Sequence, residues 1–369
     1  MSQTIFSGAD SYRKLAEILH EQGAKKILLV CGSSFKHLSI KDFIESMNVE
    51  IIRFSDFAPN PLYDDVCKGV TLFNSEKCDA ILAIGGGSAI DVAKCIKLYC
   101  KMDPSVNYLK QECFDSGIPL LTLPTTAGTG SESTRFAVIY FEGKKQSVTH
   151  QSIIPDYVIL EPAVLKCLPV YQKKSTMLDA LCQAIESWWS INSTEESKDY
   201  SKIAVKMIIE NWKQYINDNT DVAAEKIMLA ANYAGRAINI TQTTAAHALS
   251  YKLTSIYNLP HGHAVAVSLP EVWDYMNNHT SDCIDSRGPD YLKGIFSDIS
   301  EALCCSNRVE AVVGFRKFLL ELEMEYPTAS DREAELKLLT ESVNPIRLKN
   351  NPVALDSMTV RSLYERILK

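Results

Sequence analysis

The sequence predicts an α/β domain over residues 1–161 followed by an all-helical domain over residues 162–369. Three observations support this division. The chain has 369 residues, which is long for one hydrophobic core and favours two domains that share an interface. Short apolar runs alternate with helix-patterned segments before Glu161-Pro162, whereas only helical periodicity follows it. We expect a cleft between the two domains, which would be the natural place for a ligand.

The expected elements of the first domain alternate between helix and buried strand, as in βαβ units. The expected helices cover residues 12–22, 42–48, 63–75 and 89–99. The expected strands cover residues 26–31, 50–54, 79–84, 119–124 and 156–160, and residues 136–140 and 146–149 should form a β-hairpin. This alternation is typical of a Rossmann-like nucleotide-binding domain.

The junction after the strand at residues 79–84 has the sequence Gly85-Gly86-Gly87-Ser88, and a helix follows it. Three glycines let the backbone approach a ligand closely. The helix N-terminus offers free N–H groups and a positive dipole end to a pyrophosphate. A glycine turn can also simply reverse the chain, but this position between strand and helix favours a nucleotide site.

A second polar loop follows the strand that ends at Pro124. It contains Thr125, Thr126, Thr129 and Ser131 and carries little charge. Its hydroxyl groups could form hydrogen bonds to the ribose, phosphate or adenine of a nucleotide. A plain surface loop would rarely be so poor in charge.

The second domain should consist of helices. These are expected over residues 175–190, 193–211, 222–239, 243–256, 265–276 and 357–368, with an interruption at Pro345–Pro352 before the last one. No internal repeat or low-complexity linker separates them.

Three or four residues of this helical half form a candidate metal site. Asp179 and Gln183 stand four residues apart in an apolar helical run, so their side chains leave the same face. His247 and His261 are separated by a helical segment and the turn-like Asn258-Leu259-Pro260. A carboxylate and two imidazoles from separate helices suit Zn²⁺ or Fe²⁺. Each residue alone would more often be a cap or a satisfied core group, so the prediction depends on the whole set.

Composition and charge exclude several other classes. The chain is 46% hydrophobic and 22% charged, as in ordinary globular proteins. Its net charge of -7 argues against a general nucleic-acid or anionic-membrane surface, because such surfaces need a basic excess. We expect Met1-Ser2-Gln3 to lead straight into a polar helix, which does not fit a signal peptide. No apolar run reaches the length of about 18 residues that spans a bilayer.

The cysteines indicate a reducing compartment. There are eleven of them, scattered along the chain with no CxxC pair. A secreted disulfide framework would have an even number in a smaller chain. We therefore expect reduced cysteines that act as small apolar residues in a cytoplasmic protein.

The motifs DALxxAIE, from Asp179, and AHALSxxLxxxYxxPHG, from Ala246, resemble those of the iron-containing (group III) alcohol dehydrogenases. That family includes glycerol dehydrogenase and shares its fold with dehydroquinate synthase. The resemblance runs from GGGSAIDVAK near residue 85 to NPIRLKNNP near residue 350. It implies a dehydroquinate synthase-like fold and a metal-dependent NAD(P) oxidoreductase. We also expect a homodimer.

Carried over residue by residue, the resemblance places the family's metal positions on Asp179, Gln183, His247 and His261. The second of these is normally a histidine. The metal would act as a Lewis acid that polarises a carbonyl for hydride attack. Relatives often have a further histidine where this chain has Tyr251.

Because Tyr251 replaces that histidine, the residue that passes the proton is not determined by the resemblance. Tyr251, or His263 two residues beyond the metal ligand His261, could pass the proton instead. The alternative for Tyr251 is a packing role, which is commoner for a tyrosine on a helix.

The resemblance also implies cofactor contacts. The GGGS turn would hold the pyrophosphate, with Asp91 and Lys94 completing GGGSxxDxAK, and the threonine-rich loop would bind the cofactor. Lys145 matches a lysine that reaches the cofactor in relatives, although an exposed hairpin lysine is equally compatible with the spacing.

The end of the first strand bears on the choice of cofactor. Relatives that prefer NAD tend to place an Asp there, where it binds the ribose 2′-hydroxyl. This chain has Gly32, Ser33 and Ser34. Without the carboxylate, a 2′-phosphate can be tolerated and hydrogen bonded, so we expect NADPH in preference to NADH.

Two arginines bear on the substrate. Arg135 follows the cofactor loop, and Arg236 lies where relatives that act on neutral alcohols tend to carry apolar residues. Arginine forks bind phosphonate, phosphate or carboxylate in a bidentate manner, but structural salt bridges are the plain alternative. The segments TRFAVIY and QKKSTMLDALCQAIES resemble the phosphonoacetaldehyde reductase branch. That branch reduces phosphonoacetaldehyde to 2-hydroxyethylphosphonate.

Other functions stay open at this point. A general dehydrogenase for small neutral alcohols, such as butanol, propanediol or 4-hydroxybutyrate, would have the same motifs. A dehydroquinate synthase-like lyase would need many basic and amide groups, whereas the stretch from Asp179 to His263 is mostly apolar, with Trp188 and Trp189. A nucleotide sensor without catalysis would have no use for the metal residues.

Overall fold

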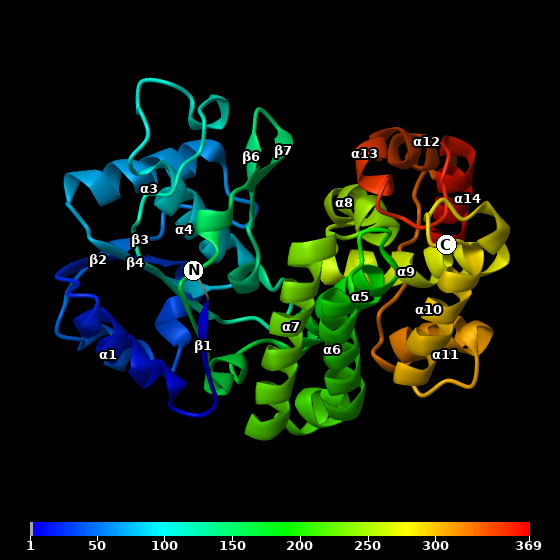
Figure 1. Ribbon diagram of the computed structural model, residues 1–369, viewed down its shortest axis with the longest axis horizontal. Helices are drawn as coiled ribbons and strands as arrows, with labels where there is room; N and C mark the ends of the chain where they lie inside the picture. The colour runs from blue at the N-terminus through cyan, green and yellow to red at the C-terminus, as the bar shows by residue number, and fades with distance from the viewer. Residues whose placement is uncertain (1–2) are drawn as a thin grey trace. The chain divides into compact units, whose positions relative to one another are not determined.

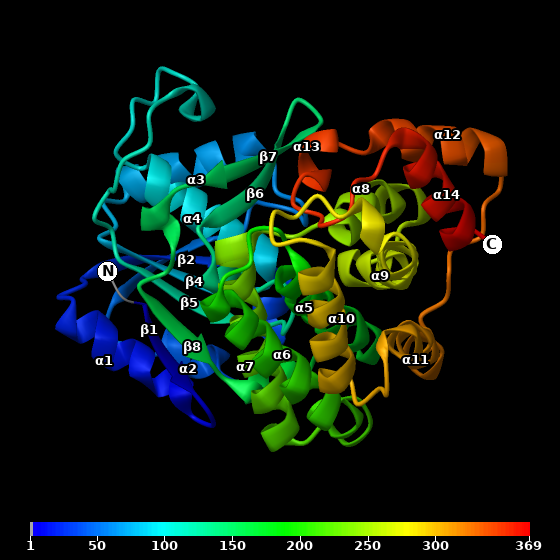
Figure 2. The same ribbon diagram turned by 45° about the vertical axis from the view of Figure 1, so that its right-hand side comes forward.

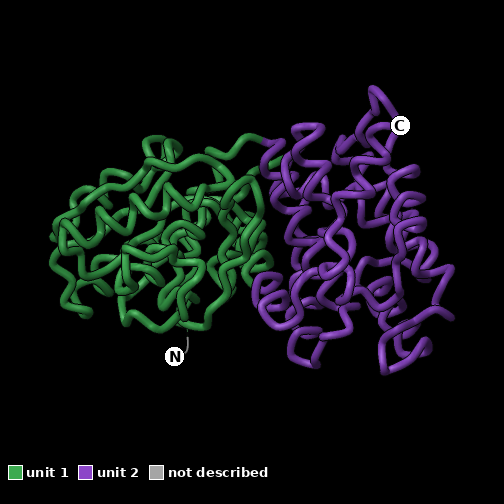
Figure 3. The backbone as a smooth tube through the Cα atoms, turned by 90° about the horizontal axis from the view of Figure 1, so that it is seen from above, with its two compact units in different colours: residues 1–169, 217–232 green, residues 170–216, 233–369 purple. Residues whose placement is uncertain are grey.

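The computed structural model describes residues 3–369 of the chain, which divide into two compact units (Figure 3). The first unit comprises residues 1–169 and 217–232, and the second comprises residues 170–216 and 233–369. The predicted boundary at residue 161 differs from this division. The segment from 217 to 232 joins the first unit through side-chain contacts such as Lys166 Nζ to Asp221 Oδ1 at 2.7 Å and Asn232 Nδ2 to Ser133 Oγ at 2.6 Å.

Among the described residues, the first unit contains a six-stranded sheet and a separate β-hairpin. The strand order of the sheet is β1-β8-β5-β4-β2-β3, and every pair is parallel. The strands are β1 (Thr4–Ser7), β2 (Lys26–Cys31), β3 (Glu50–Phe54), β4 (Ala80–Gly85), β5 (Leu120–Pro124), β6 (Phe136–Phe141), β7 (Lys144–Thr149) and β8 (Tyr157–Leu160). β6 and β7 form the predicted hairpin, and both turn residues, Glu142 and Gly143, have positive φ.

The helices of the first unit cover both faces of this sheet, as a doubly wound fold requires. Figures 1 and 2 show α3 (Tyr63–Ser75) and α4 (Gly87–Tyr99) on one face and α1 (Lys14–Glu21) and α2 (Lys41–Glu45) on the other. β4 and β5 are buried along their whole length. That explains why both strands are apolar, apart from Thr122 in β5, and show no alternation.

The start of the chain corrects one prediction. We expected a polar helix directly after residue 3, but β1 comes first and pairs with β8, with Thr4 opposite Tyr157 and Ser7 opposite Leu160. A four-residue edge strand shows too little alternation to be recognised in a sequence. Its partner lies about 150 residues further along the chain, so local pattern could not reveal the pairing.

The second unit is helical, as predicted. Its helices are α5 (Val170–Trp189), α6 (Glu195–Lys213), the end of α7 (Asp221–Thr241), α8 (Ala245–Tyr257), α9 (His261–Asn278), α10 (Pro289–Ala302), α11 (Arg308–Glu321), α12 (Arg332–Ser342), α13 (Pro345–Leu348) and α14 (Ser357–Ile367). α5 packs against both α6 and α9, and α8 packs against α9. The helices α5, α8 and α9 carry the predicted metal residues.

Two general expectations can be compared with this structure. All eleven cysteines are free thiols. No helix within residues 3–369 is long and apolar enough to cross a membrane.

Candidate active site

The predicted cofactor loops begin at one edge of the parallel sheet. β2, β4 and β5 are neighbours, with Cys31 opposite Ile84 and Gly85 opposite Pro124. Their carboxyl ends are therefore level, and the loops that follow them start side by side. In open α/β sheets this edge is where nucleotides bind.

The glycine turn and the threonine-rich loop form a close-packed cradle. A Cβ atom on Gly86 would lie 3.3 Å from the Thr126 side chain, and one on Gly87 would lie 3.1 Å from Thr129. Such contacts are tighter than most real Cβ contacts, so glycine lets the two loops approach each other without displacing the threonine side chains. Gly87 and Ser88 open α4, whose N-terminus receives no side-chain cap. An uncapped N-terminus behind a glycine turn fits the pyrophosphate of a dinucleotide.

Asp91 and Ser131 brace this cradle from within. Asp91 Oδ1 accepts a 2.5 Å hydrogen bond from Ser131 Oγ, and its Oδ2 accepts a 3.0 Å bond from the Val138 amide of β6. Burial raises the pKa of Asp91, and the nearby ammonium groups of Lys94 and Lys145 work against this rise. The ammonium group of Lys145 thus interacts electrostatically with Asp91, and its contact with the cofactor stays a prediction.

Lys94 ties the same loops together from a fully buried position. Its Nζ donates to Thr134 O at 2.7 Å, Phe136 O at 2.8 Å and Ser131 Oγ at 3.2 Å. Burial lowers the pKa of Lys94 to about 8, although the carboxylates of Asp91 and Glu132 oppose this. Thr125 is buried at the start of the loop, with its amide bonded to Gly85 O at 2.9 Å.

The loop after β2 contains the three residues for which we expect a role at the ribose end of the cofactor. Gly32 caps the short 3-10 helix η2 (Ser33–His37), and Ser33 and Ser34 are exposed in its first turn. Hydroxyl groups are thus exposed in this loop, and the preference for NADPH stays a prediction.

The candidate metal residues converge in the second unit. Asp179 lies in α5, His247 in α8 and His261 at the first position of α9. One ligand atom from each lies within 4.8 Å of the others. Asp179 Oδ1 is 3.3 Å from His247 Nε2 and 3.9 Å from His261 Nε2. Gln183 is buried one helical turn after Asp179 on the same face of α5.

The donors of this cluster fit a divalent cation. His247 Nε2 is buried and makes no hydrogen bond within the described chain, which is costly unless a proton or a metal lies there. Burial alone would lower the pKa of His247, but Glu186 and Asp179 outweigh it and raise the pKa to about 10. The pocket thus attracts positive charge, and its N/O donor set suits Fe²⁺ or Zn²⁺.

Sequence reasoning missed the role of Glu186. This glutamate is completely buried in α5, and its Oε2 forms a very short contact with His247 Nδ1. Asp179, Gln183 and Glu186 recur at spacings of four and three residues, which places a polar stripe along one face of an apolar helix. That periodicity was the available signal, because a carboxylate in an apolar stripe calls for a partner.

Gly262 is a second residue that the sequence did not single out. A Cβ atom at this position would lie 2.0 Å from the Ser175 carbonyl oxygen and 2.8 Å from Asp179 Cβ. Glycine therefore allows α9 to approach α5 directly beside His261, so that His261 lies close to Asp179.

The two candidate proton carriers differ in their surroundings. The Tyr251 ring stacks on the His261 ring, with centroids 5.8 Å apart and planes 4° apart. Both ring nitrogens of His263 instead form hydrogen bonds within the protein: Nδ1 lies 2.7 Å from Tyr171 Oη and Nε2 lies 2.8 Å from Glu325 O. Burial lowers the pKa of His263. Geometry therefore favours Tyr251.

The two arginines belong to different units, Arg135 to the first and Arg236 to the second. The Arg135 guanidinium lies over the Phe136 ring at 5.1 Å. The Arg236 guanidinium lies 5.7 Å from the Tyr233 ring and 5.8 Å from the Tyr200 ring. Both guanidinium groups thus lie within cation–π distance of aromatic rings.

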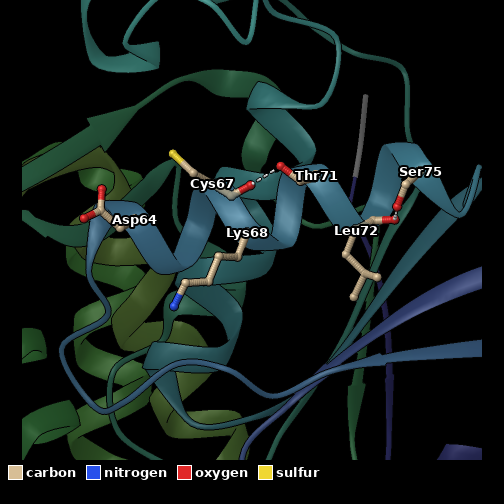
Figure 4. A pocket seen from close by; sticks show the side chains of 6 residues that line it. All are labelled: Asp64, Cys67, Lys68, Thr71, Leu72 and Ser75. Atoms are coloured by element: carbon tan, nitrogen blue, oxygen red, sulfur yellow. Dashed lines mark hydrogen bonds between the residues drawn. The ribbon is translucent and has the colours of Figure 1, made fainter.

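A shallow hollow on the outer side of α3 contains none of the predicted site residues (Figure 4). Residues of that one helix line it: Asp64, Cys67, Lys68, Thr71, Leu72 and Ser75. It has no cluster of convergent polar groups, and we assign it no function.

Comparison with known proteins identifies the family. The family described as iron-containing alcohol dehydrogenase matches residues 2–162, and its C-terminal counterpart matches residues 173–368. Phosphonoacetaldehyde reductase of Streptomyces viridochromogenes is 32% identical over 306 residues, which cover 79% of this chain and 76% of that protein. Long-chain-alcohol dehydrogenase 1 of Geobacillus thermodenitrificans is 28% identical over 362 residues, or 93% of this chain and 89% of that protein.

Solved structures agree on the fold. Sulfoacetaldehyde reductase from Bifidobacterium kashiwanohense, in complex with NAD⁺, superposes with a TM-score of 0.88 at 24% identity, covering 99% of this chain and 96% of that one. The predicted dehydroquinate synthase-like fold is confirmed, and so are the NAD(P) and divalent metal cofactors of the family. The chain therefore belongs to the iron-containing alcohol dehydrogenases, a family of NAD(P)-dependent oxidoreductases.

Proposed function

We propose that this enzyme reduces a small aldehyde with an anionic head group, with phosphonoacetaldehyde as the leading substrate and 2-hydroxyethylphosphonate as the product. The observation that carries the proposal is Arg236, an arginine held beside two tyrosine rings in the unit that holds the metal residues. The 32% identity to a phosphonoacetaldehyde reductase supports it.

The first unit would bind the dinucleotide. The amides that open α4 would receive the pyrophosphate, and Thr126 and Thr129 would line the cradle. Lys94 and Asp91 would keep these loops in place through the hydrogen bonds described above, so that little reorganisation accompanies cofactor binding. The exposed hydroxyls of Ser33 and Ser34 would accommodate a 2′-phosphate, which supports NADPH.

The second unit would hold the metal through Asp179, His247 and His261, with Gln183 beside them. When bound, the metal supplies a Lewis acid that polarises the substrate carbonyl. The neutral amide of Gln183 is a weaker donor than an imidazole, so three residues would do most of the binding. A catalytic site keeps a coordination position open in this way.

Tyr251 would hold the proton that the nascent alcohol requires. Its ring stacks on His261, which keeps the phenol next to the metal residues. His263 is less suited, because both of its ring nitrogens already form hydrogen bonds.

The test uses arginine variants with two classes of aldehyde. A charge-assisted hydrogen bond from arginine contributes roughly 1.5–3 kcal/mol, so Arg236→Leu or Arg135→Leu should lower kcat/KM for phosphonoacetaldehyde by about tenfold to a hundredfold. Activity on propanal or butanal should change little. Arg236→Lys serves as a matched variant, because it keeps the charge and loses only the planar fork.

Two results would refute the anionic substrate. If both leucine variants lose activity on all aldehydes equally, the arginines are structural. If Arg236→Lys and Arg236→Leu retain full activity on the phosphonate, no anion is held there.

The second candidate function is a general reductase for neutral aldehydes, which the 28% identity to a long-chain-alcohol dehydrogenase favours.

A further inference from the structure

We propose that Glu186 is a positioning residue that fixes both the tautomer and the helix of His247, and that it thereby sets the metal affinity of the site. The inference rests on the metal site of the proposed function. It concerns a residue that would not touch the metal, the substrate or the cofactor.

The hydrogen-bond partners of the Glu186 carboxylate all belong to Thr244 and His247. It is completely buried, and within residues 3–369 no Lys or Arg forms an ion pair with it. Its Oε1 accepts from Thr244 Oγ1 at 2.8 Å, from Thr244 N at 3.2 Å and from His247 N at 3.3 Å. Its Oε2 faces His247 Nδ1. A buried carboxylate needs such donors, because burial without them is very costly.

The contacts at Oε1 hold the backbone that carries His247. Thr244 is the N-cap of α8, but its own side chain makes no capping hydrogen bond. Its hydroxyl accepts from Trp189 Nε1 at 2.9 Å, so its proton points towards Glu186. Glu186 thus satisfies two of the orphan amides at the start of α8 from a neighbouring helix, in place of a local cap.

The contact at Oε2 decides which nitrogen of the ring carries the proton. An ionised carboxylate only accepts, so Nδ1 of His247 must donate. In the neutral ring Nε2 then carries the lone pair, and this atom is buried 3.3 Å from Asp179 Oδ1. In the neutral ring two lone pairs would face each other across that distance, and a proton or a metal cation between them resolves the conflict. The arrangement matches the carboxylate–histidine–metal pattern that raises ligand basicity.

Glu186→Gln should separate the two roles of Glu186, which are to bind the amides at the start of α8 and to fix the tautomer of His247. Its amide oxygen can keep the bonds to Thr244 and to the His247 amide, but its NH₂ group then faces Nδ1. The ring must now accept at Nδ1 and carry its proton on Nε2, where the metal would bind. The opposite amide orientation would place NH₂ against three donors, which leaves buried groups unsatisfied.

We expect Glu186→Gln to weaken Zn²⁺ and Co²⁺ binding by about tenfold to a hundredfold, measured by competition with a chelator. Glu271→Gln is the matched control. Glu271 is also a buried carboxylate, but it pairs with Arg316 at 2.8 Å and Tyr326 at 3.1 Å. Its variant should bind metal as the wild type does. Unchanged metal affinity in a folded Glu186→Gln protein would overturn the proposal.

Asp179→Asn shows whether the metal site itself is correct. If Asp179→Asn loses the metal and Glu186→Gln keeps it, the proposal about Glu186 fails and the site stands. If Asp179→Asn binds metal normally, the site of the proposed function is wrong.

A measurement on the wild type covers the case in which Glu186→Gln does not fold. In zinc-loaded protein with ¹⁵N-labelled imidazoles, the His247 ring is assigned by the loss of its signals in His247→Gln. We expect a protonated Nδ1 and a zinc-shifted Nε2. An unprotonated Nδ1 would contradict the role of Glu186.

Discussion

Replacing Gly262 with alanine should damage the metal site without removing any ligand. The added Cβ would lie 2.0 Å from the Ser175 carbonyl oxygen and 2.8 Å from Asp179 Cβ, whereas real Cβ contacts essentially never fall below 3.0 Å. Ser175 contributes a backbone atom, so no side-chain rotation relieves the clash. α9 must move away from α5 by about 1 Å, since helix interiors cannot absorb such overlap.

That displacement is large for a metal site. Overpacking of this kind costs about 1–3 kcal/mol of stability. His261 is the residue next to Gly262, so it would shift relative to Asp179, whereas metal–ligand distances tolerate deviations of only about 0.2 Å. We therefore expect metal affinity to fall by at least about tenfold, in line with the loss that a misplaced ligand shell causes.

The assay is Co²⁺ titration followed by ligand-field absorbance, with urea unfolding of the metal-free protein in parallel. The matched control is Gly294→Ala in α10, where an added Cβ meets no atom within 4 Å. That variant should bind Co²⁺ normally and gain about 0.5 kcal/mol of stability. The reasoning is refuted if Gly262→Ala is folded and binds Co²⁺ as tightly as Gly294→Ala.

The remaining predictions concern the metal ligands, the cofactor and pH. Gln183→His should slow metal loss during dialysis, because imidazole is a stronger donor than an amide; equal loss from both proteins, by elemental analysis, would argue against a ligand position there. Steady-state kinetics should favour NADPH over NADH, and a clear NADH preference would contradict the role of Ser33 and Ser34. Burial lowers the pKa of His263 below its ordinary 6.5, so the unfolded chain binds more protons just below pH 6.5. The urea midpoint of the metal-free protein should therefore fall as pH drops below about 6.5, and this slope should be weaker in His263→Asn; parallel pH profiles would disprove the assignment.

Much of the fold was predictable because its signals are local. The buried strands β4 and β5 are short and almost entirely apolar, and the turn Gly85-Gly86-Gly87 separates a strand from a helix. The apolar residues of the amphipathic helices recur with the helical period. β1 was missed, because its stability comes from pairing with β8 far along the chain. The helix start at His261 was also missed: the predicted helix began at residue 265, after the turn-like Asn258-Leu259-Pro260.

The candidate metal residues could be predicted from the sequence, but the residues that position them could not. Asp179, His247 and His261 are residue types with an obvious metal chemistry, and the structure brings them within 4.8 Å of one another. Glu186 and Gly262 act through contacts between helices. The spacing of Asp179, Gln183 and Glu186 indicates that Glu186 needs a buried partner, but it does not identify His247 as that partner. For His263 the sequence suggested a role that the contacts do not favour. We predicted that it could pass a proton because it lies two residues after His261, but its ring nitrogens contact Tyr171 and Glu325.

Competition between two aldehydes tests the proposed function most directly. Wild-type enzyme with NADPH is given equal concentrations of phosphonoacetaldehyde and propanal, and both alcohols are measured at low conversion, which gives the ratio of the two kcat/KM values. One charge-assisted arginine contact predicts at least about tenfold more 2-hydroxyethylphosphonate than propanol. Equal amounts of the two alcohols, or an excess of propanol, would contradict an anion-binding site and leave a general aldehyde reductase.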